Sequence, residues 1–84
     1  MELEAIKIKV KEAIQQVTGV DAAGISDSAS YIDDLGLDSL AILEIAVAVE
    51  SEFKFQATDE ELSSIRTVED TITLVRRRIF AEVA

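Results

Sequence analysis

The chain has 84 residues, 17 acidic and 8 basic, with a formal net charge of −9 at pH 7 and neither cysteine nor histidine. A chain of this length forms one small domain, residues 1–84, whose limited core leaves little room for a buried active site. Without Cys and His there are no disulfides, thiolate nucleophiles, histidine-assisted serine catalysis or usual zinc sites, so we expect neither an enzyme nor a metal site.

The acidic residues are concentrated in the middle of the chain. From Asp21 to Glu61 there are 11 acidic residues and one basic residue, Lys54. A negative field of this kind repels nucleic acid and attracts basic protein surfaces. We therefore expect protein partners and no nucleic acid, the alternative being that the charge serves solubility alone.

The expected cellular location follows from two features that the sequence does not show, a membrane span and a signal peptide. No apolar run approaches the ~18 residues of a membrane span, and the N-terminus has no signal-peptide layout. We expect a cytoplasmic protein with no membrane partner. The Met start and the absence of linker sequence favour a freestanding protein, which we expect to be a monomer.

The N-terminal segment predicts an amphipathic helix of about fifteen residues. Apolar residues recur there at spacings of three and four, which places them on one helical face together with Ala13. They are Leu3, Ile6, Val10, Ile14 and Val17. Gly19 is a plausible end for this helix.

A long loop is predicted from Val20 to Leu37, because this stretch is rich in Gly, Ser, Asp and Ala and its apolar residues are scattered. We expect the loop to be held to a core at several points. The apolar residues available for this are Ile25, Tyr31, Ile32 and Leu35. Loops of this length are unusual in compact domains and are often functional.

Three further helices are predicted. The second should run from about Ser39 to Phe53, and a short third one from about Asp59 to Ile65, where Thr58 and Glu61 have the spacing of a capping box. Thr67 and Asp70 indicate the start of the last helix. That helix carries Val68, Ile72, Val75, Ile79 and Val83 on one face. The fold class is therefore all-α: a four-helix bundle with three longer helices, one short third helix and a long loop between helices 1 and 2.

The predicted helix from Ser39 to Phe53 is too apolar for one packing surface. One face can serve the core and consists of Ile42, Ile45, Ala46, Val49 and Phe53. A second stripe, Leu40, Leu43 and Val47, is rotated from it by more than a right angle and is bordered by Glu44, Glu50 and Ser51. Exposed, this stripe would suit a partner protein. The alternative is that it packs under the long loop.

Ser39 stands where the predicted loop becomes this helix. Asp38 is a favourable N-cap, which leaves the Ser39 side chain free to point outward. The unpaired N–H groups and the helix dipole at such a position stabilise an attached anion. A phosphodiester on the Ser39 oxygen would fit there.

These residues resemble the acyl carrier protein family, the phosphopantetheine-binding carriers. The resemblance begins at Ala29-Ser30-Tyr31-Ile32 and is strongest in Leu35-Gly36-Leu37-Asp38-Ser39-Leu40 at the head of the helix. It continues to Glu50 and Phe53 and, less closely, through Thr58 to Val68. An acidic, four-helix chain of this length is also typical of the family.

The resemblance implies that a phosphopantetheinyl transferase moves 4′-phosphopantetheine from coenzyme A onto the Ser39 hydroxyl. The thiol of the arm would then hold acyl groups as thioesters for partner enzymes that load, elongate or release them through basic docking surfaces. By position, the residues implied to face partners are Asp38, Leu40, Leu43, Glu44, Val47 and Glu50. The last two helices are implied to close an apolar cleft for the chain.

Several residues depart from the fatty-acid carriers. Ala41 and Ser51 stand where acidic residues are common, Val47 replaces a frequent Met, and the usual Pro before the third helix is absent. A less acidic surface weakens steering by basic partners, so we expect a specialised pathway, polyketide or other secondary metabolism, over housekeeping fatty-acid synthesis. Two alternatives remain: a peptidyl or aryl carrier of non-ribosomal peptide type, and a non-carrier helical interaction module.

Overall fold

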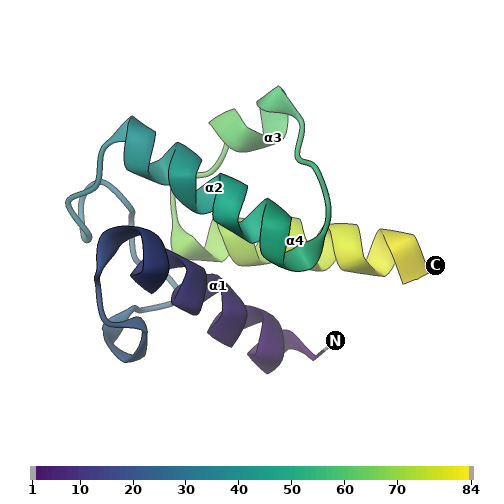
Figure 1. Ribbon diagram of the computed structural model, residues 1–84, viewed down its shortest axis with the longest axis horizontal. Helices are drawn as coiled ribbons and strands as arrows, with labels where there is room; N and C mark the ends of the chain where they lie inside the picture. The colour runs from purple at the N-terminus through teal and green to yellow at the C-terminus, as the bar shows by residue number, and fades with distance from the viewer. Residues whose placement is uncertain (1, 84) are drawn as a thin grey trace.

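The computed structural model describes the backbone of residues 2–83 and the side chains of residues 2–79 (Figure 1). The helices are α1 (Leu3–Thr18), α2 (Ser39–Phe53), α3 (Asp59–Ser63) and α4 (Val68–Val83), with a 3₁₀ turn, η1 (Ala22–Gly24), in the loop after α1. Over this described range there is no strand, and the only β-type pairing is an isolated bridge between Ser30 and Thr67. The predicted all-α fold, with a short third helix, is confirmed.

The three longer helices pack against one another. Helix α1 contacts α2 and α4, and α2 contacts α4. In Figure 1, α1 runs opposite to the other two, while α3 lies to one side of them. No helix of the described residues is long and apolar enough to cross a membrane.

Local signals end and start the helices close to the expected positions. Gly19 ends α1 in the left-handed conformation (φ 80°), and its N–H donates to the Gln15 carbonyl oxygen at 2.7 Å. Thr58 and Glu61 form the expected capping box at the start of α3. Helix α3 ends at Ser63 and does not reach Ile65, because the Ser64 N–H bonds three residues back, to the Glu61 carbonyl oxygen. That tighter turn closes the helix.

The core is built largely from the apolar faces predicted for the helices. Its fully or nearly fully buried members come from α1 (Ile6, Val10, Ala13, Ile14), α2 (Ile45, Ala46, Val49) and α4 (Val68, Ile72, Leu74, Val75), with Ile25, Ala29, Tyr31 and Ile65 from the loops. Leu74 of α4, which was not on the predicted face, is also buried, whereas four predicted members are only partly buried: Val17, Ile42, Phe53 and Ile79. Leu3, expected on the same face, is exposed at the beginning of α1. The expectation for Val83 lies outside the side chains that the structure describes.

The long loop is held to the core, as expected, but one of its predicted contacts is wrong. Ile25 and Tyr31 are buried and Leu35 packs partly against the core, whereas Ile32 is 58% exposed. Tyr31 and Ile32 are adjacent residues in a series of hydrogen-bonded turns. The Tyr31 side chain is directed into the core, and the Ile32 side chain lies outside it.

Polar contacts also fasten the loop. The Asp27 carboxylate lies 2.5 Å from Lys11 Nζ and 2.8 Å from Lys7 Nζ, both on α1. Hydrogen bonds from Lys11 and then Lys7 lower the Asp27 pKa to about 2. Two backbone bonds join the loop to the segment before α4: the Tyr31 N–H donates to the Arg66 carbonyl oxygen, and the Val68 N–H to that of Ala29.

Helix α3 is fastened chiefly by one side chain of α4. The Arg78 guanidinium pairs with the Glu61 carboxylate and donates to the Gln56 carbonyl oxygen at 3.1 Å. It also lies 5.8 Å from the centre of the Phe55 ring. Helix α3 itself contains no buried residue. Its position therefore depends on these contacts together with Leu62, which packs partly against the core.

Candidate functional site

Ser39 is the first residue of α2, and Asp38 is its N-cap. The Asp38 side chain accepts a hydrogen bond from the Ala41 N–H at 2.9 Å, while the Asp38 carbonyl oxygen accepts the Ile42 N–H at 3.1 Å. Asp38 thus supplies the oxygen that the first turn needs. The Ser39 side chain is exposed and hydrogen-bonds to nothing in the described part of the chain.

A series of turns places Ser39 at this point. Asp34 accepts the Ser30 N–H at 2.7 Å, and the Leu37 N–H donates to the Tyr31 carbonyl oxygen at 2.9 Å. Gly36 between them has φ 67°, a backbone conformation that is costly for residues with a Cβ atom. The buried Tyr31 ring anchors the same segment. The segment is therefore tied to the core shortly before α2 begins.

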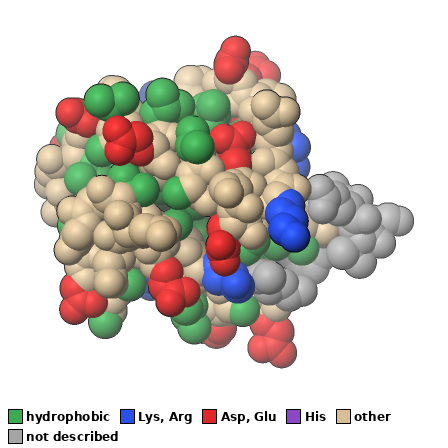
Figure 2. All heavy atoms as spheres, viewed as in Figure 1, with side chains coloured by type: hydrophobic (Ala, Val, Ile, Leu, Met, Phe, Trp, Pro, Cys, Tyr) green, Lys and Arg blue, Asp and Glu red, His purple; other side chains and the backbone are tan. Residues whose placement is uncertain are grey.

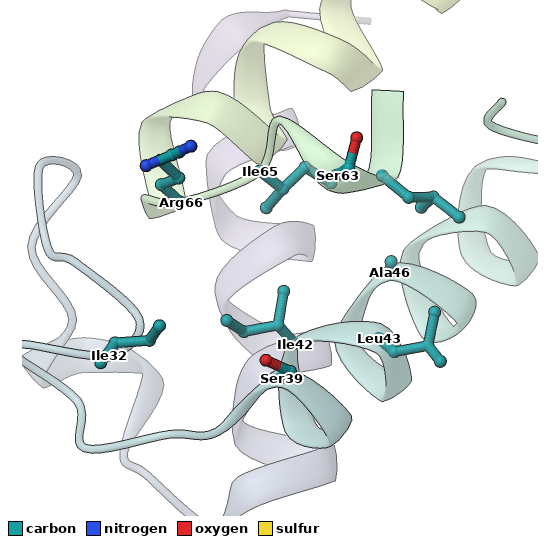
Figure 3. Close-up of a pocket in the computed structure, with 9 residues that line it drawn as sticks. Ile32, Ser39, Ile42, Leu43, Ala46, Ser63, Ile65 and Arg66 are labelled. Atoms are coloured by element: carbon teal, nitrogen blue, oxygen red, sulfur yellow. The ribbon is translucent and has the colours of Figure 1, made fainter. Parts of the chain in front are cut away.

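A hollow of about 310 Å³ opens beside Ser39 (Figure 3). One wall comes from α2, the other from α3 and the segment after it, with Ile32 at the loop end. The lining residues are Ile32, Ser39, Ile42, Leu43, Ala46, Leu62, Ser63, Ile65 and Arg66. The lining is mostly apolar. Among the described side chains, none from α4 lines the hollow, so the implied closure by both of the last helices is not seen there: the segment joining them forms that part of the wall.

The second apolar stripe of α2 is exposed. Leu40, Leu43 and Val47 have 63%, 47% and 56% of their surface accessible, so they do not pack under the loop. Figure 2 shows hydrophobic side chains gathered over α2, with acidic side chains among them. The stripe begins beside Ser39 and offers an apolar surface with a polar border.

The three acidic residues predicted to face partners differ in their surroundings. Asp38 caps α2. Glu50 is half-buried, and its Oε2 accepts the Ala57 N–H at 2.7 Å, which ties down the loop after α2. Glu44 is exposed and, within the described residues, has no hydrogen bond or ion pair. Glu44 therefore presents its charge to solvent without a structural task.

Seven lining residues of the hollow were not among the predicted site residues: Ile32, Ile42, Ala46, Leu62, Ser63, Ile65 and Arg66. Ile42 and Ala46 were assigned to the core face of their helix. Ile32 was assigned to the core, and Ser63 has no distinguishing sequence signal. Arg66 could have been noticed as the first basic residue after Lys54, at the end of the acidic stretch.

The residues around Ser39 fit a phosphodiester-linked arm. The hydroxyl is accessible, it stands at the end of a helix that favours negative charge, and an apolar hollow adjoins it. Across the described residues, no cluster of acidic side chains has the arrangement of a metal site.

The chain is similar in sequence to a known family and to several known proteins. The family described as "Phosphopantetheine attachment site" matches residues 9–75. An acyl carrier protein of Solidesulfovibrio magneticus is 41% identical over 70 residues, covering 83% of this chain and 90% of the relative. One of Bdellovibrio bacteriovorus is 40% identical over 74 residues, covering 88% and 95%.

A third relative is longer than this chain. The meromycolate extension acyl carrier protein of Mycobacterium leprae is 38% identical over 74 residues, which cover 88% of this chain but 64% of the relative. The matches to the two shorter relatives span nearly their whole length, and the family match includes α2 with Asp38 and Ser39. The chain therefore belongs to the phosphopantetheine-attachment family, the family of the acyl carrier proteins.

Proposed function

We propose that Ser39 Oγ is the attachment point of 4′-phosphopantetheine and that the protein carries acyl intermediates for partner enzymes of fatty-acid, polyketide or related biosynthesis. The observation that carries the assignment is the accessible, unengaged Ser39 hydroxyl at the capped start of α2. The apolar hollow on one side and the exposed stripe on the other support it.

Attachment is a phosphoryl transfer to Ser39. The Ser39 oxygen forms a bond to the phosphorus of coenzyme A that bears the pantetheine, the pyrophosphate bond breaks, and adenosine 3′,5′-bisphosphate leaves. A base on the transferase takes the hydroxyl proton, since this chain has no His or Cys and Asp38 is engaged as the cap. The first turn of α2 then faces the negative charge of the phosphodiester.

The prosthetic group supplies a thiol on which an acyl group is held as a thioester. The chain provides the point of attachment, the recognition surface and a partial shelter. Ile42, Ala46 and Ile65 offer apolar surface in the hollow, which favours the hydrocarbon part of a carried group.

The partner surface is proposed to be the stripe of Leu40, Leu43 and Val47 with Glu44 beside it. A phosphopantetheinyl transferase and acyl-handling enzymes with basic docking surfaces would bury the stripe and approach the acidic border. Asp38 and Glu50 belong to the same proposed surface, although each also serves the fold.

The specialised pathway also remains a proposal. It is supported by Ala41 and Ser51, which leave the face of α2 less acidic than it would be with carboxylates at both positions. Partners that rely on apolar contact more than on charge would suit this surface.

Attachment is tested by intact mass after incubation with coenzyme A, magnesium and a broad-specificity phosphopantetheinyl transferase. Wild type should gain the mass of one phosphopantetheine, and Ser39→Ala should gain none. Ser63→Ala is the matched control, because it removes another hydroxyl that lines the hollow, and it should be modified like wild type. If wild type gains no mass with several transferases, the proposal that the protein is a carrier is wrong. If Ser39→Ala still gains the mass, Ser39 is not the attachment site.

A further inference from the structure

One peptide group in the loop between α2 and α3 is bound at both of its polar atoms. It is the peptide that joins Gln56 to Ala57. Its N–H donates to Glu50 Oε2 at 2.7 Å, and its carbonyl oxygen accepts a hydrogen bond from Arg78 Nη1 at 3.1 Å. Glu50 is in the last turn of α2, and Arg78 is on α4. Side chains from two of the three longer helices therefore meet at a single peptide of the loop.

The charges of these two side chains suit the two ends of the peptide. A peptide group is a dipole of about 3.5 D, with its positive end at the N–H and its negative end at the carbonyl oxygen. The Glu50 carboxylate lies at the positive end and the Arg78 guanidinium at the negative end. Each contact polarises the peptide in the sense that strengthens the other. The two contacts should therefore be coupled, although no ion pair among the described side chains joins Glu50 directly to Arg78.

Helix α3 has few other contacts that hold it in place. It contains no buried residue, and its Leu62 packs only partly against the core. Arg78 also pairs with Glu61, whose carboxylate accepts the Thr58 N–H in the capping box. The same guanidinium thus holds both α3 and the loop that leads into it. The position of α3 therefore depends on a series of polar contacts that has Glu50 at one end.

Helix α3 forms part of the wall of the hollow that faces α2. Leu62 and Ser63 line the hollow from α3, and Figure 3 shows Ser63 across the hollow from Leu43 and Ser39 of α2. Whatever holds α3 in place therefore sets the separation of the two walls. Glu50 contributes to this through the loop, although its position in the sequence predicted only a partner-facing role.

We propose that Glu50 is a positioning residue: together with Arg78 it holds the Gln56–Ala57 peptide, and through that peptide it holds α3 and the far wall of the hollow. When either side chain is lost, α3 separates more readily from the bundle while α1, α2 and α4 stay together, because the main core lies between those three helices. This role does not depend on attachment at Ser39. It is therefore tested on the unmodified chain, and its failure would leave the proposed carrier function untouched.

Amide hydrogen exchange, followed residue by residue by NMR, measures such local opening. The Ala57 amide reports on the loop. The Leu62 amide, which donates to the Thr58 carbonyl oxygen at 2.9 Å, reports on α3. In Glu50→Ala both amides should exchange about ten-fold faster than in wild type, because a charge-assisted hydrogen bond is lost. Glu50→Gln keeps an oxygen for the Ala57 N–H and should give an intermediate rate.

Glu44→Ala is the matched control for Glu50→Ala. It removes a carboxylate from an exposed position on the same helix and should leave the exchange rates of Ala57 and Leu62 as in wild type. If Leu62 exchanges at the wild-type rate in Glu50→Ala as well, the positioning role of Glu50 is wrong.

The coupling through one peptide is tested with Arg78→Met, alone and combined with Glu50→Ala. Arg77→Met, at an exposed neighbouring position of α4, is its control and should exchange like wild type. The acceleration at Leu62 in the double variant should be smaller than the product of the two single effects, because each substitution weakens the contact that the other removes. An acceleration equal to that product would show that the two side chains act independently and would overturn the coupling.

The response to urea separates local opening of α3 from unfolding of the whole chain. Local opening exposes little surface, so exchange at Leu62 should change little at low urea concentrations. Exchange at Val10 and Val75, which are fully buried on α1 and α4, should accelerate steeply. If Leu62 exchanges as slowly as these two residues and responds to urea as they do, α3 does not open separately and the proposal is overturned.

Discussion

Tyr31 Oη lies 2.6 Å from Thr71 Oγ1, and both side chains are buried. This hydrogen bond joins the end of the long loop to α4 through the core. Burial, partly opposed by the Thr71 hydrogen bond, raises the Tyr31 pKa to about 12, so the phenol stays neutral at ordinary pH. The segment leading to Ser39 thus depends on a neutral hydroxyl pair inside the bundle.

Thr71→Val should destabilise the protein by about 1–3 kcal/mol, because it leaves the Tyr31 hydroxyl buried without its partner. Tyr31→Phe should cost less, about 0.5–1.5 kcal/mol, since it removes the polar group as well as the bond. Urea unfolding at pH 7 measures both free energies. If Thr71→Val lowers the free energy of unfolding no more than Tyr31→Phe does, the buried hydrogen bond between Tyr31 and Thr71 does not hold the loop as argued.

The Asp27 contacts predict a stability that depends on pH. Its folded pKa, about 2, lies below the ordinary aspartate value of 3.8, so the contribution is present at neutral pH and is lost as pH falls from about 4 towards 2. Asp27 is partly exposed, so Asp27→Asn should cost less than ~1 kcal/mol at pH 7.

Urea midpoints at pH 7 and pH 2.5 measure this cost for Asp27→Asn. The difference from wild type should shrink at the lower pH. Glu12→Gln is the control. It removes a carboxylate from an exposed position on α1 and should have little effect on the urea midpoint at either pH. A difference for Asp27→Asn that stays constant with pH would contradict the pairing with Lys7 and Lys11.

Two substitutions separate the structural and recognition tasks of Asp38. Asp38→Ala removes the cap of α2 and should cost about 1 kcal/mol and slow modification by the transferase. Asp38→Asn keeps a capping oxygen and removes the charge, so it should preserve the unfolding free energy to within ~0.5 kcal/mol while still slowing modification. Thermal unfolding and intact-mass time courses measure the two effects. An unchanged rate for Asp38→Asn would leave Asp38 with a capping role only.

The exposed stripe is tested by Leu43→Arg. Because Leu43 is already half exposed, the helical circular-dichroism signal should stay close to that of wild type, whereas modification by the transferase should weaken. Ile8→Arg is the matched control, since Ile8 is 56% exposed on α1, away from Ser39 in the sequence. Global unfolding of Leu43→Arg, or equal loss of modification in Ile8→Arg, would argue against the stripe as the docking surface.

The helices could be predicted because their signals are local. The spacing of Ile6, Val10 and Ile14 defines a face, and Asp38 satisfies the first turn of α2 whatever lies elsewhere in the chain. The position of Ser39 at the head of α2 followed from these patterns.

The identity of the side chains that line the hollow could not be predicted in the same way. Ile32 points outward because Tyr31 is anchored through bonds to Arg66 and Thr71, which follow it by 35 and 40 residues in the sequence. No spacing of apolar residues within the loop encodes such a choice. Arg66 lines the hollow for the same reason, since its segment is placed by backbone pairing with the loop.

The contacts that hold α3 in place determine the size of the hollow. Leu62 and Ser63 line the hollow from α3, and Arg78 attaches the helix through Glu61 and Gln56. An outward displacement of α3 would break these contacts and the partial packing of Leu62 against the core, but it would move no fully buried side chain of α3, because α3 contains none. The capacity of the hollow therefore depends on a few polar contacts and one partly buried leucine, whereas the main core lies between the three longer helices.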